Sequence, residues 1–522
     1  MSAPDDTLKP SRPVPRAPLP GDEVFDAVVI GAGFGGLAAA LRLVESGARV
    51  CLLEALNYPG GCASTFRRAG HRFESGATLF SGFGEGQLFR KIIDRHALDV
   101  TVDFLDPVVT LRTPEGSLAI PPDRDALIER LSALPGAPAK QIATFFATQR
   151  KVADLLWDIL DDPALLPPWT LPAFLRHVGR APRYLRLLPL LGKTLGDVLA
   201  SHRLQGFAPL VTFLDALCQI TLQCSSAEVE APFALGTMDY YSRGTGHVRG
   251  GIGTLAWALL GAVQRLGGNV QLACAAKRIE RTAEGYVVHT RRGPVRARAV
   301  ISNLLPQTTG QMLGDSAPPE LARLAEKVEG GWGANMLYAV ARPPAGADGP
   351  CHVEIVQDTS LPFTLGNHLF CSISGPHDEG RAPAGRRTIT VSTHVPLREL
   401  RALPAAERGP YVSRVHATMR AGLERFLPEW WSGVELTMTA SPRTFERFTG
   451  RHLGYVGGVP RRAGLHNYAS LGPTEPLPRL FLVGDSVFPG QSTLATALSG
   501  IKAAERLVGP PAAEKRTGAP AI

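Results

Sequence analysis

The sequence lacks several of the features that would assign a class at once. Its seven cysteines form no C-x-x-C pair and are odd in number, so we expect neither a disulfide framework nor a zinc site, and a reducing compartment fits. Its 13 histidines are scattered without a metal-ligand spacing, so no metal is expected. No segment holds about 18 uncharged apolar residues in a row, which argues against a membrane-spanning helix.

Aromatic side chains are also scarce. They make up 7% of the 522 residues and no nucleic-acid module is visible, so we expect no nucleic-acid partner despite the net charge of +8. That charge suits acidic surfaces, including an anionic membrane face. The 44% of hydrophobic residues is typical of a soluble protein, and the length predicts two or three domains. Residues 1–23 and 509–522 are interpreted as a disordered arm and tail.

A glycine-rich turn between a strand and a helix is the clearest motif that is present. FDAVVIGAGFGGLAAALRLVESGARVCLLEA (residues 25–55) reads as strand, turn, helix and second strand, with G-x-G-x-x-G at Gly31, Gly33 and Gly36. Gly31 permits the tight turn, Gly33 lets the backbone approach a pyrophosphate, and Gly36 lets the helix pack on the strand. The motif therefore predicts a bound dinucleotide.

Further contacts to that dinucleotide follow from the same stretch. The helix begins at Phe34 and Gly35, whose N–H groups and dipole face the anion. Glu54, followed by Ala55, ends the second strand, where an acid accepts hydrogen bonds from ribose hydroxyls. The acid argues against the 2′-phosphate of NADP. An ordinary glycine turn is the alternative interpretation of this motif.

Two later segments favour FAD over NAD. A second glycine loop at Gly60 and Gly61, with Thr65 after it, suits a longer dinucleotide held from two sides, although an ordinary surface turn has the same composition. Near the C-terminus, LPRLFLVGDSVFPGQSTLATALSGIKAAERL again reads as strand, turn and helix.

In that C-terminal segment the strand ends at Gly484 and Asp485, and the helix begins near Thr493 and Leu494. Such an arrangement can hold the ribityl chain and stabilise an anionic reduced flavin with the helix dipole. The alternative is that Asp485 is simply a turn residue. We expect FAD bound without a covalent link.

These segments carry a resemblance that covers residues from about 25 to 508. The chain resembles the amine-oxidase-type flavoprotein superfamily and, within it, the phytoene desaturase and carotenoid isomerase family, which includes retinol saturases. The matching pieces are VIGAGFGGLAAALRL, PGGCASTFRRAGHRFESGA, GHVRGGIGTLAWALLGAVQRLGGNVQL, ARAVISNLLP, SISGPHDEGRAPAGRRTITVSTHVP, TFERFTGR and LFLVGDSVFPGQSTLATALSG. The chain departs from the family pattern at Arg249, where proline is usual, and at Glu74, where aspartate is usual.

The resemblance implies an α/β fold with a discontinuous, Rossmann-like FAD-binding domain of the glutathione-reductase type and an α+β substrate domain. The FAD-binding domain would combine residues 24–105, 240–335 and 440–508. The substrate domain would combine residues 106–239 and 336–439.

One segment, residues 167–199, has the composition of an interfacial membrane element. It mixes Trp, Phe, Tyr and Leu with arginines, and it contains no acid between Trp169 and Lys193. A substrate stored in a bilayer would need such a docking surface. The alternative is a helical lid whose leucines face the protein's own core. We therefore expect a cytoplasmic protein that can dock on a membrane surface.

The resemblance implies that the substrate is a long apolar polyene. The leading hypothesis is a carotenoid desaturase of carotenoid biosynthesis, in which the flavin takes a hydride while a proton leaves the neighbouring carbon. Redox-neutral cis–trans isomerisation on reduced FAD is the nearest alternative. Glu74, His247 and Arg249 are the only candidate catalytic side chains, and each has a structural interpretation as well.

Two further alternatives stay open. A flavin amine oxidase would need aromatic rings around a cationic substrate, and Phe481 and Phe488 are the only rings near the C-terminal motif. A non-catalytic flavoprotein would keep the nucleotide fold without turnover. The electron acceptor is also open among oxygen, a quinone and a nicotinamide.

Overall fold

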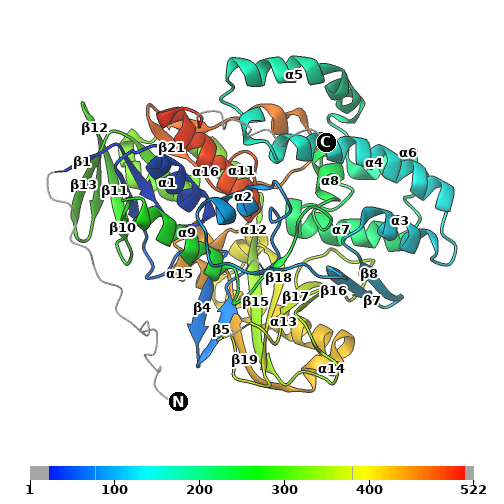
Figure 1. Ribbon diagram of the computed structural model, residues 1–522. Coiled ribbons are helices and arrows are strands. Elements are labelled where there is room, and N and C mark those ends of the chain that lie inside the picture. The colour runs from blue at the N-terminus through cyan, green and yellow to red at the C-terminus, as the bar shows by residue number, and fades with distance from the viewer. Residues whose placement is uncertain (1–22, 77, 379, 512–522) are drawn as a thin grey trace.

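The computed structural model describes residues 23–76, 78–378 and 380–511. The predicted disordered arm and tail, residues 1–23 and 509–522, lie almost wholly outside this range. Two large sheets and a layer of helices make up the described chain (Figure 1). In this part of the chain no helix is both long and apolar enough to cross a membrane.

The first large sheet has six strands in the order β10-β3-β2-β14-β21-β20, parallel except for the last pair. Its strands are β2 (Ala27–Ile30), β3 (Val50–Leu53), β10 (Asn269–Gln271), β14 (Val300–Ser302), β20 (Thr474–Leu477) and β21 (Leu480–Leu482). The central strands are short apolar runs buried on both faces, as a parallel sheet between two layers requires.

Helices cover one face of this sheet and a smaller sheet covers the other. Val29, Leu52 and Ile301 pack with the helices, whereas Val28 and Leu53 pack with the small sheet. The helices are α1 (Phe34–Glu45), α9 (Gly253–Arg265) and α16 (Thr493–Val508). The small sheet, in the order β1-β13-β12-β11, contains β1 (Val24–Phe25), β11 (Ala276–Thr282), β12 (Gly285–Thr290) and β13 (Gly293–Ala297).

Helices α1 and α16 pack backbone against backbone. A Cβ on Gly500 would lie 2.0 Å from the carbonyl oxygen of Gly35, so no larger residue fits at this crossing. The contact brings the N-termini of both helices to the edge of the sheet where β2, β14 and β21 end. The two glycine turns predicted to hold the cofactor thus meet at one place.

The second large sheet has seven strands in the order β19-β15-β18-β17-β16-β7-β8. They are β7 (Val109–Thr113), β8 (Gly116–Ile120), β15 (Trp332–Ala341), β16 (Cys351–Val356), β17 (His368–Ile373), β18 (Arg387–Pro396) and β19 (Val434–Ala440). Leu337 and Ala339 pack on the side of helix α13 (Ala405–Phe426), while Met336 and Tyr338 face the opposite way. That second face borders the functional site.

A helical layer packs beside the second sheet, and its outermost member is α5 (Figure 1). Its elements are α3 (Arg124–Ser132), α4 (Ala139–Leu160), α5 (Leu171–Tyr184), the 3-10 helix η2 (Leu185–Leu190), α6 (Leu195–Ser201), α7 (Ala208–Leu222) and α8 (Ala231–Thr237). The connecting helices are α2 (Leu88–Arg95), α10 (Pro306–Leu313), α11 (Pro319–Val328), α12 (Leu397–Ala402), α14 (Pro428–Trp431) and α15 (Pro442–Thr449). A short hairpin, β4 (Thr65–Arg68) with β5 (His71–Glu74), and an antiparallel pair of strands distant in sequence, β6 (Val102–Asp103) with β9 (His247–Val248), complete the fold.

The predicted fold class, an α/β protein with a Rossmann-like nucleotide domain, is confirmed by this architecture. The parallel sheet draws its strands from the three segments predicted for FAD binding. Strand β15 begins at Trp332, slightly before the predicted boundary between residues 335 and 336. The domain boundaries themselves stay a prediction.

Candidate active site

A large cavity connects the glycine turns with the helical layer. Its volume is about 890 Å³. One end is bordered by the turns after β2 and β21, and the other by Trp169, just before α5, and His177 in the middle of that helix. Between these ends the walls are mostly apolar, and they include Leu156, Trp157, Leu160, Ile220, Phe233, Met336, Phe370 and Phe445.

At the nucleotide end, three glycines surround the side chain of Asn303. A Cβ on Gly33 would lie 2.5 Å from Asn303 Nδ2, and a Cβ on Gly35 or Gly484 would lie 2.7 or 3.0 Å from Asn303 Oδ1. Only glycine therefore fits at these turns without a shift of Asn303. Because these turns carry no Cβ atoms, their backbone is accessible to a ligand, as a bound pyrophosphate requires.

Glu54 is fixed by its neighbours before any ligand binds. Its Oε2 accepts a hydrogen bond from Ala32 N at 2.7 Å, and its Oε1 accepts one from Leu56 N at 2.8 Å. Burial raises the pKa of Glu54, and these backbone hydrogen bonds oppose the rise. The carboxylate borders the cavity with lone pairs left over, as the predicted ribose contact requires.

The structure brings nearly all predicted cofactor residues together around the cavity. Those that line it are Gly31, Gly33, Phe34, Gly35, Glu54, Ala55, Gly60, Gly61, Gly484, Asp485, Thr493 and Leu494. Gly36 and Thr65 do not. A Cβ on Gly36 would lie 1.9 Å from the carbonyl oxygen of Gly31, so this glycine permits packing, and Thr65 Oγ1 instead accepts a hydrogen bond from Gly253 N.

Several lining residues were not predicted from the sequence. Asn303 directly follows strand β14, and a parallel strand that ends at the same sheet edge is a signal that could have identified it. Arg451 forms an ion pair with Asp485 at 2.8 Å, but 34 residues separate the two in the sequence. Gln491 lies next to the predicted helix start.

Unpaired polar atoms line the cavity near the start of helix α16. The buried side-chain oxygens Gln491 Oε1 and Thr493 Oγ1 have no hydrogen-bond partner among the described residues, and both side chains line the cavity. Ser492 caps helix α16 by accepting a hydrogen bond from Ala495 N. The residues present thus fit FAD, which supplies the two-electron acceptor and donor when it is bound.

The three candidate catalytic residues lie outside the lining of the cavity. Glu74 and His247 are buried and belong to a polar cluster, and Arg249 is exposed and forms an ion pair with Asp103 at 2.7 Å. Within the cluster, His247 Nε2 lies 2.8 Å from a carboxylate oxygen of Asp378.

This polar cluster ties several loops together. Glu74 accepts a hydrogen bond from Ile252 N and lies 3.4 Å from Arg381. Asp378 accepts hydrogen bonds from Gly250 N and Gly375 N. Burial alone would raise the pKa of Asp378, but its hydrogen bond and ion pair with His247 outweigh burial and lower it to about 2. These contacts support the structural rather than the catalytic interpretation of Glu74 and His247.

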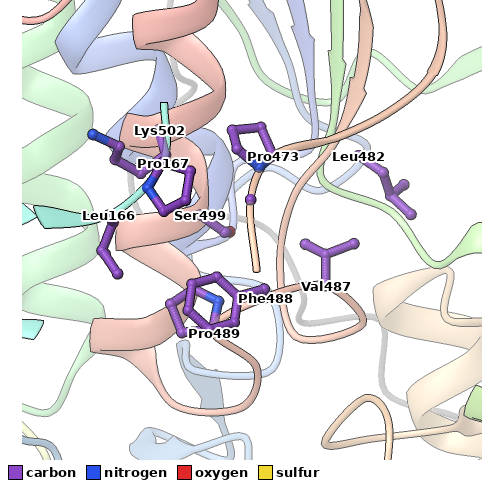
Figure 2. Close-up of a pocket in the computed structure, with 10 residues that line it drawn as sticks. Leu166, Pro167, Pro473, Leu482, Val487, Phe488, Pro489, Ser499 and Lys502 are labelled. Atoms are coloured by element: carbon purple, nitrogen blue, oxygen red, sulfur yellow. The ribbon is translucent and has the colours of Figure 1, made fainter. Parts of the chain in front are cut away.

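The outer end of the cavity opens beneath α5 and η2. Trp169, which is 50% exposed, and Leu471, which is 40% exposed, both line the cavity and mark its mouth. Leu166 and Pro167 border a small hollow with the loop before α16, and Figure 2 shows Pro167 beside Ser499 and Lys502 of that helix. Lys502 Nζ donates a hydrogen bond to the carbonyl oxygen of Pro163.

The α5–η2 segment, residues 171–190, presents apolar side chains to solvent. The exposed ones are Leu171, Phe174, Leu175, Val178, Leu185 and Leu188, and Leu171 is 71% exposed. Ala173 is the only residue of α5 that is buried. The leucines of this segment are therefore divided: Leu171, Leu175, Leu185 and Leu188 face solvent, whereas Leu187 and Leu190 pack against the core, as the alternative interpretation of residues 167–199 expects.

A buried carboxylate fixes the loops that flank this segment. Glu230 accepts hydrogen bonds from Gly192 N at 2.7 Å, from Gly464 N at 2.6 Å and from the hydroxyl of Tyr468 at 3.0 Å. Because an amide nitrogen cannot accept from these donors, we expect Glu230→Gln to lower the free energy of unfolding by about 2 kcal/mol.

Chemical denaturation and hydrogen exchange would measure this effect. Exchange in residues 185–193 and 464–468 should be faster in the variant. Glu228→Gln is the control, because Glu228 is largely exposed and its substitution should change stability by less than about 0.5 kcal/mol. Equal unfolding free energies for wild type and Glu230→Gln would contradict the assigned role.

His394, in the cavity wall, makes the free energy of unfolding depend on pH. Burial, and then the nearby His368, lower the pKa of His394 to about 4. The unfolded chain binds this proton near pH 6.5, so stability falls as the pH drops from about 6.5 to about 4 and then levels off. Between about pH 7 and pH 4.5 the wild type should lose about 2 kcal/mol more unfolding free energy than His394→Gln. Parallel urea titrations check this, and equal losses would contradict it.

Comparisons with known proteins agree with this site. Residues 34–508 match the family described as flavin containing amine oxidoreductase. The prolycopene isomerase of Arabidopsis thaliana is 28% identical over 95% of this chain and 85% of its own length. The human all-trans-retinol 13,14-reductase is 24% identical over 89% of this chain and 83% of its own length. A phytoene desaturase of Cereibacter sphaeroides, described as neurosporene-forming, is 38% identical over 19% of each chain.

Solved structures show the same fold. A crystal structure of an oxidoreductase from Methanosarcina mazei superposes with a TM-score of 0.62 at 19% identity, covering 91% of this chain and 98% of that one. The family match begins at Phe34, within the N-terminal glycine motif, and includes the C-terminal glycine turn at Gly484, and both turns border the cavity. The chain therefore belongs to the flavin containing amine oxidoreductase family and is an oxidoreductase-type enzyme with FAD as its cofactor.

Proposed function

We propose that this enzyme acts on the conjugated double bonds of a long apolar polyene, as a carotenoid cis–trans isomerase or desaturase that takes its substrate from a membrane. The observation that carries the proposal is the form of the cavity. It is continuous with the flavin site, has mostly apolar walls, and opens beneath an exposed apolar segment. A small cationic amine would need neither the length nor the apolar entrance.

The relatives favour isomerisation over desaturation, the leading hypothesis from the sequence. The similarity to prolycopene isomerase extends over almost the whole chain, and the retinol reductase also acts on a polyene. Desaturation remains the second candidate, because a shorter stretch is more similar to a phytoene desaturase. Both reactions use the same flavin and the same apolar cavity.

Membrane docking would explain the exposed α5–η2 segment. Its apolar side chains would enter the interface between lipid headgroups and acyl chains. Arg180 and Arg186 lie among them and would attract anionic lipids, whereas Arg176 and Arg183 form ion pairs with Asp162 and Asp158. The mouth at Trp169 and Leu471 would then face the acyl chains, so that a polyene could enter the cavity without crossing water.

The proposal is tested by anaerobic turnover in liposomes that contain prolycopene or phytoene. An isomerase changes the polyene spectrum at constant product mass, and only when the flavin has been reduced beforehand. A desaturase bleaches the oxidised flavin while the product loses a pair of hydrogens. If neither polyene changes while the flavin is bound and reducible, the proposal is wrong.

A further inference from the structure

One stretch of the cavity wall combines apolar and polar side chains in register. Strands β15, β18 and β17 lie side by side, and Met336 and Phe370 flank Ser392 on either side. One step along the sheet, Ala334 is paired with His394. All five side chains line the cavity. His394 is therefore an imidazole set into a largely apolar wall.

The tautomer of His394 follows from its partner. The amide nitrogen of Gln219, a buried residue of α7, lies 3.3 Å from His394 Nδ1. Because an amide nitrogen only donates, Nδ1 accepts and the proton of the neutral ring is on Nε2. The Nε2–H group is then the donor that His394 can offer to a molecule in the cavity.

Two features of its environment keep the imidazole ring of His394 neutral. Burial and the neighbouring His368 lower the pKa of His394 to about 4, so the ring stays uncharged near neutral pH. His368 itself is buried and lies 3.6 Å from Glu354, away from the cavity lining. A neutral imidazole suits an apolar cavity, because a fixed charge there would carry a large desolvation cost.

We propose that His394 donates a hydrogen bond from Nε2 to an oxygen of the substrate, so that the preferred substrate is a long polyene carrying a hydroxyl or carbonyl group. This inference rests on the proposed function and narrows its substrate class. A pure hydrocarbon would leave the donor unpaired in the cavity, whereas an oxygen would pair it. The difference corresponds to about tenfold in affinity.

The test uses two polyenes that differ only in oxygen. Canthaxanthin has a carbonyl on each ring, whereas β-carotene has the same skeleton without oxygen. Binding of each to the FAD-loaded protein is measured by quenching of tryptophan fluorescence, since Trp157 and Trp169 line the cavity. The carbonyl stretching frequency of bound canthaxanthin is measured by Raman spectroscopy. Zeaxanthin, with hydroxyl groups, shows whether a hydroxyl serves as well as a carbonyl.

Variants separate the hydrogen bond from general effects on packing. His394→Leu removes the donor, and His394→Gln restores an amide donor at the same position. Thr390→Val is the matched control, because Thr390 lies four residues earlier on the same face of β18, is buried, and does not line the cavity.

The wild type and Thr390→Val should bind canthaxanthin about tenfold more tightly than β-carotene and lower its carbonyl frequency. His394→Leu should lose both effects and bind β-carotene more tightly than the wild type does, because no donor is left unpaired, and His394→Gln should regain part of the preference. Equal affinities in the wild type, or an unchanged preference in His394→Leu, would overturn this inference alone. If the wild type bound no polyene at all, the proposed function would fail with it.

Discussion

Gly36→Ala should abolish FAD binding. A Cβ at this position would lie 1.9 Å from the carbonyl oxygen of Gly31, in the turn that joins β2 to α1. The clash is with a backbone oxygen, which cannot rotate away as a flexible side chain could. The turn must therefore open and α1 must move. We expect at least a tenfold lower flavin content and a loss of about 3 kcal/mol in the free energy of unfolding.

The flavin-to-protein absorbance ratio and thermal unfolding with added FAD measure both effects. Gly310→Ala in α10 is the matched control, because no atom lies within 4 Å of its added Cβ and its neighbour Met312 borders the same cavity. This control should keep its flavin and be as stable as the wild type or slightly more so. Wild-type flavin content in Gly36→Ala would contradict the assigned turn geometry.

The second large effect is expected at the entrance. Replacing Leu171, Phe174 and Leu175 together by serine should weaken binding to anionic liposomes at least a hundredfold, because each side chain would otherwise bury apolar surface in the membrane. All three are exposed, so the fold should be unaffected. Turnover of liposome-embedded polyene should fall in parallel, whereas turnover in detergent should be preserved.

Liposome co-sedimentation measures the binding. Phe104→Ser serves as control, since Phe104 is 61% exposed but lies outside the α5–η2 segment. Its binding should equal that of the wild type. If the triple variant sediments with liposomes as the wild type does, the α5–η2 segment is not the docking surface.

Local patterns singled out residues of the predicted nucleotide site that the structure places around one cavity. The geometry of a glycine turn can be predicted from a few consecutive residues, because a tight turn or a close approach of the backbone requires glycine at fixed positions. Gly33, Glu54 and Asp485 could therefore be placed from the sequence, and all three border the cavity. The exposure of Leu171 also follows the acid-free pattern of its segment.

The substrate half could not be predicted in the same way. His394 and Gln219 are 175 residues apart in the sequence and meet only because β18 and α7 pack together. Glu74 and His247 were candidate catalytic residues because they can transfer protons and lie near glycine motifs in the sequence. In the structure both belong to a buried cluster with Asp378 and Arg381. Both the contact between His394 and Gln219 and the buried cluster depend on packing between segments distant in sequence, which no local sequence pattern predicts.

The most direct test of a polyene enzyme is an anaerobic titration of the FAD-loaded protein with prolycopene, followed at the flavin absorption band. A polyene in the cavity beside the flavin should perturb this band in a saturable manner with one site per chain, and benzylamine should neither compete with it nor bleach the flavin. Bleaching by benzylamine, with no response to the polyene, would instead identify an amine oxidase and contradict the assignment of a polyene substrate.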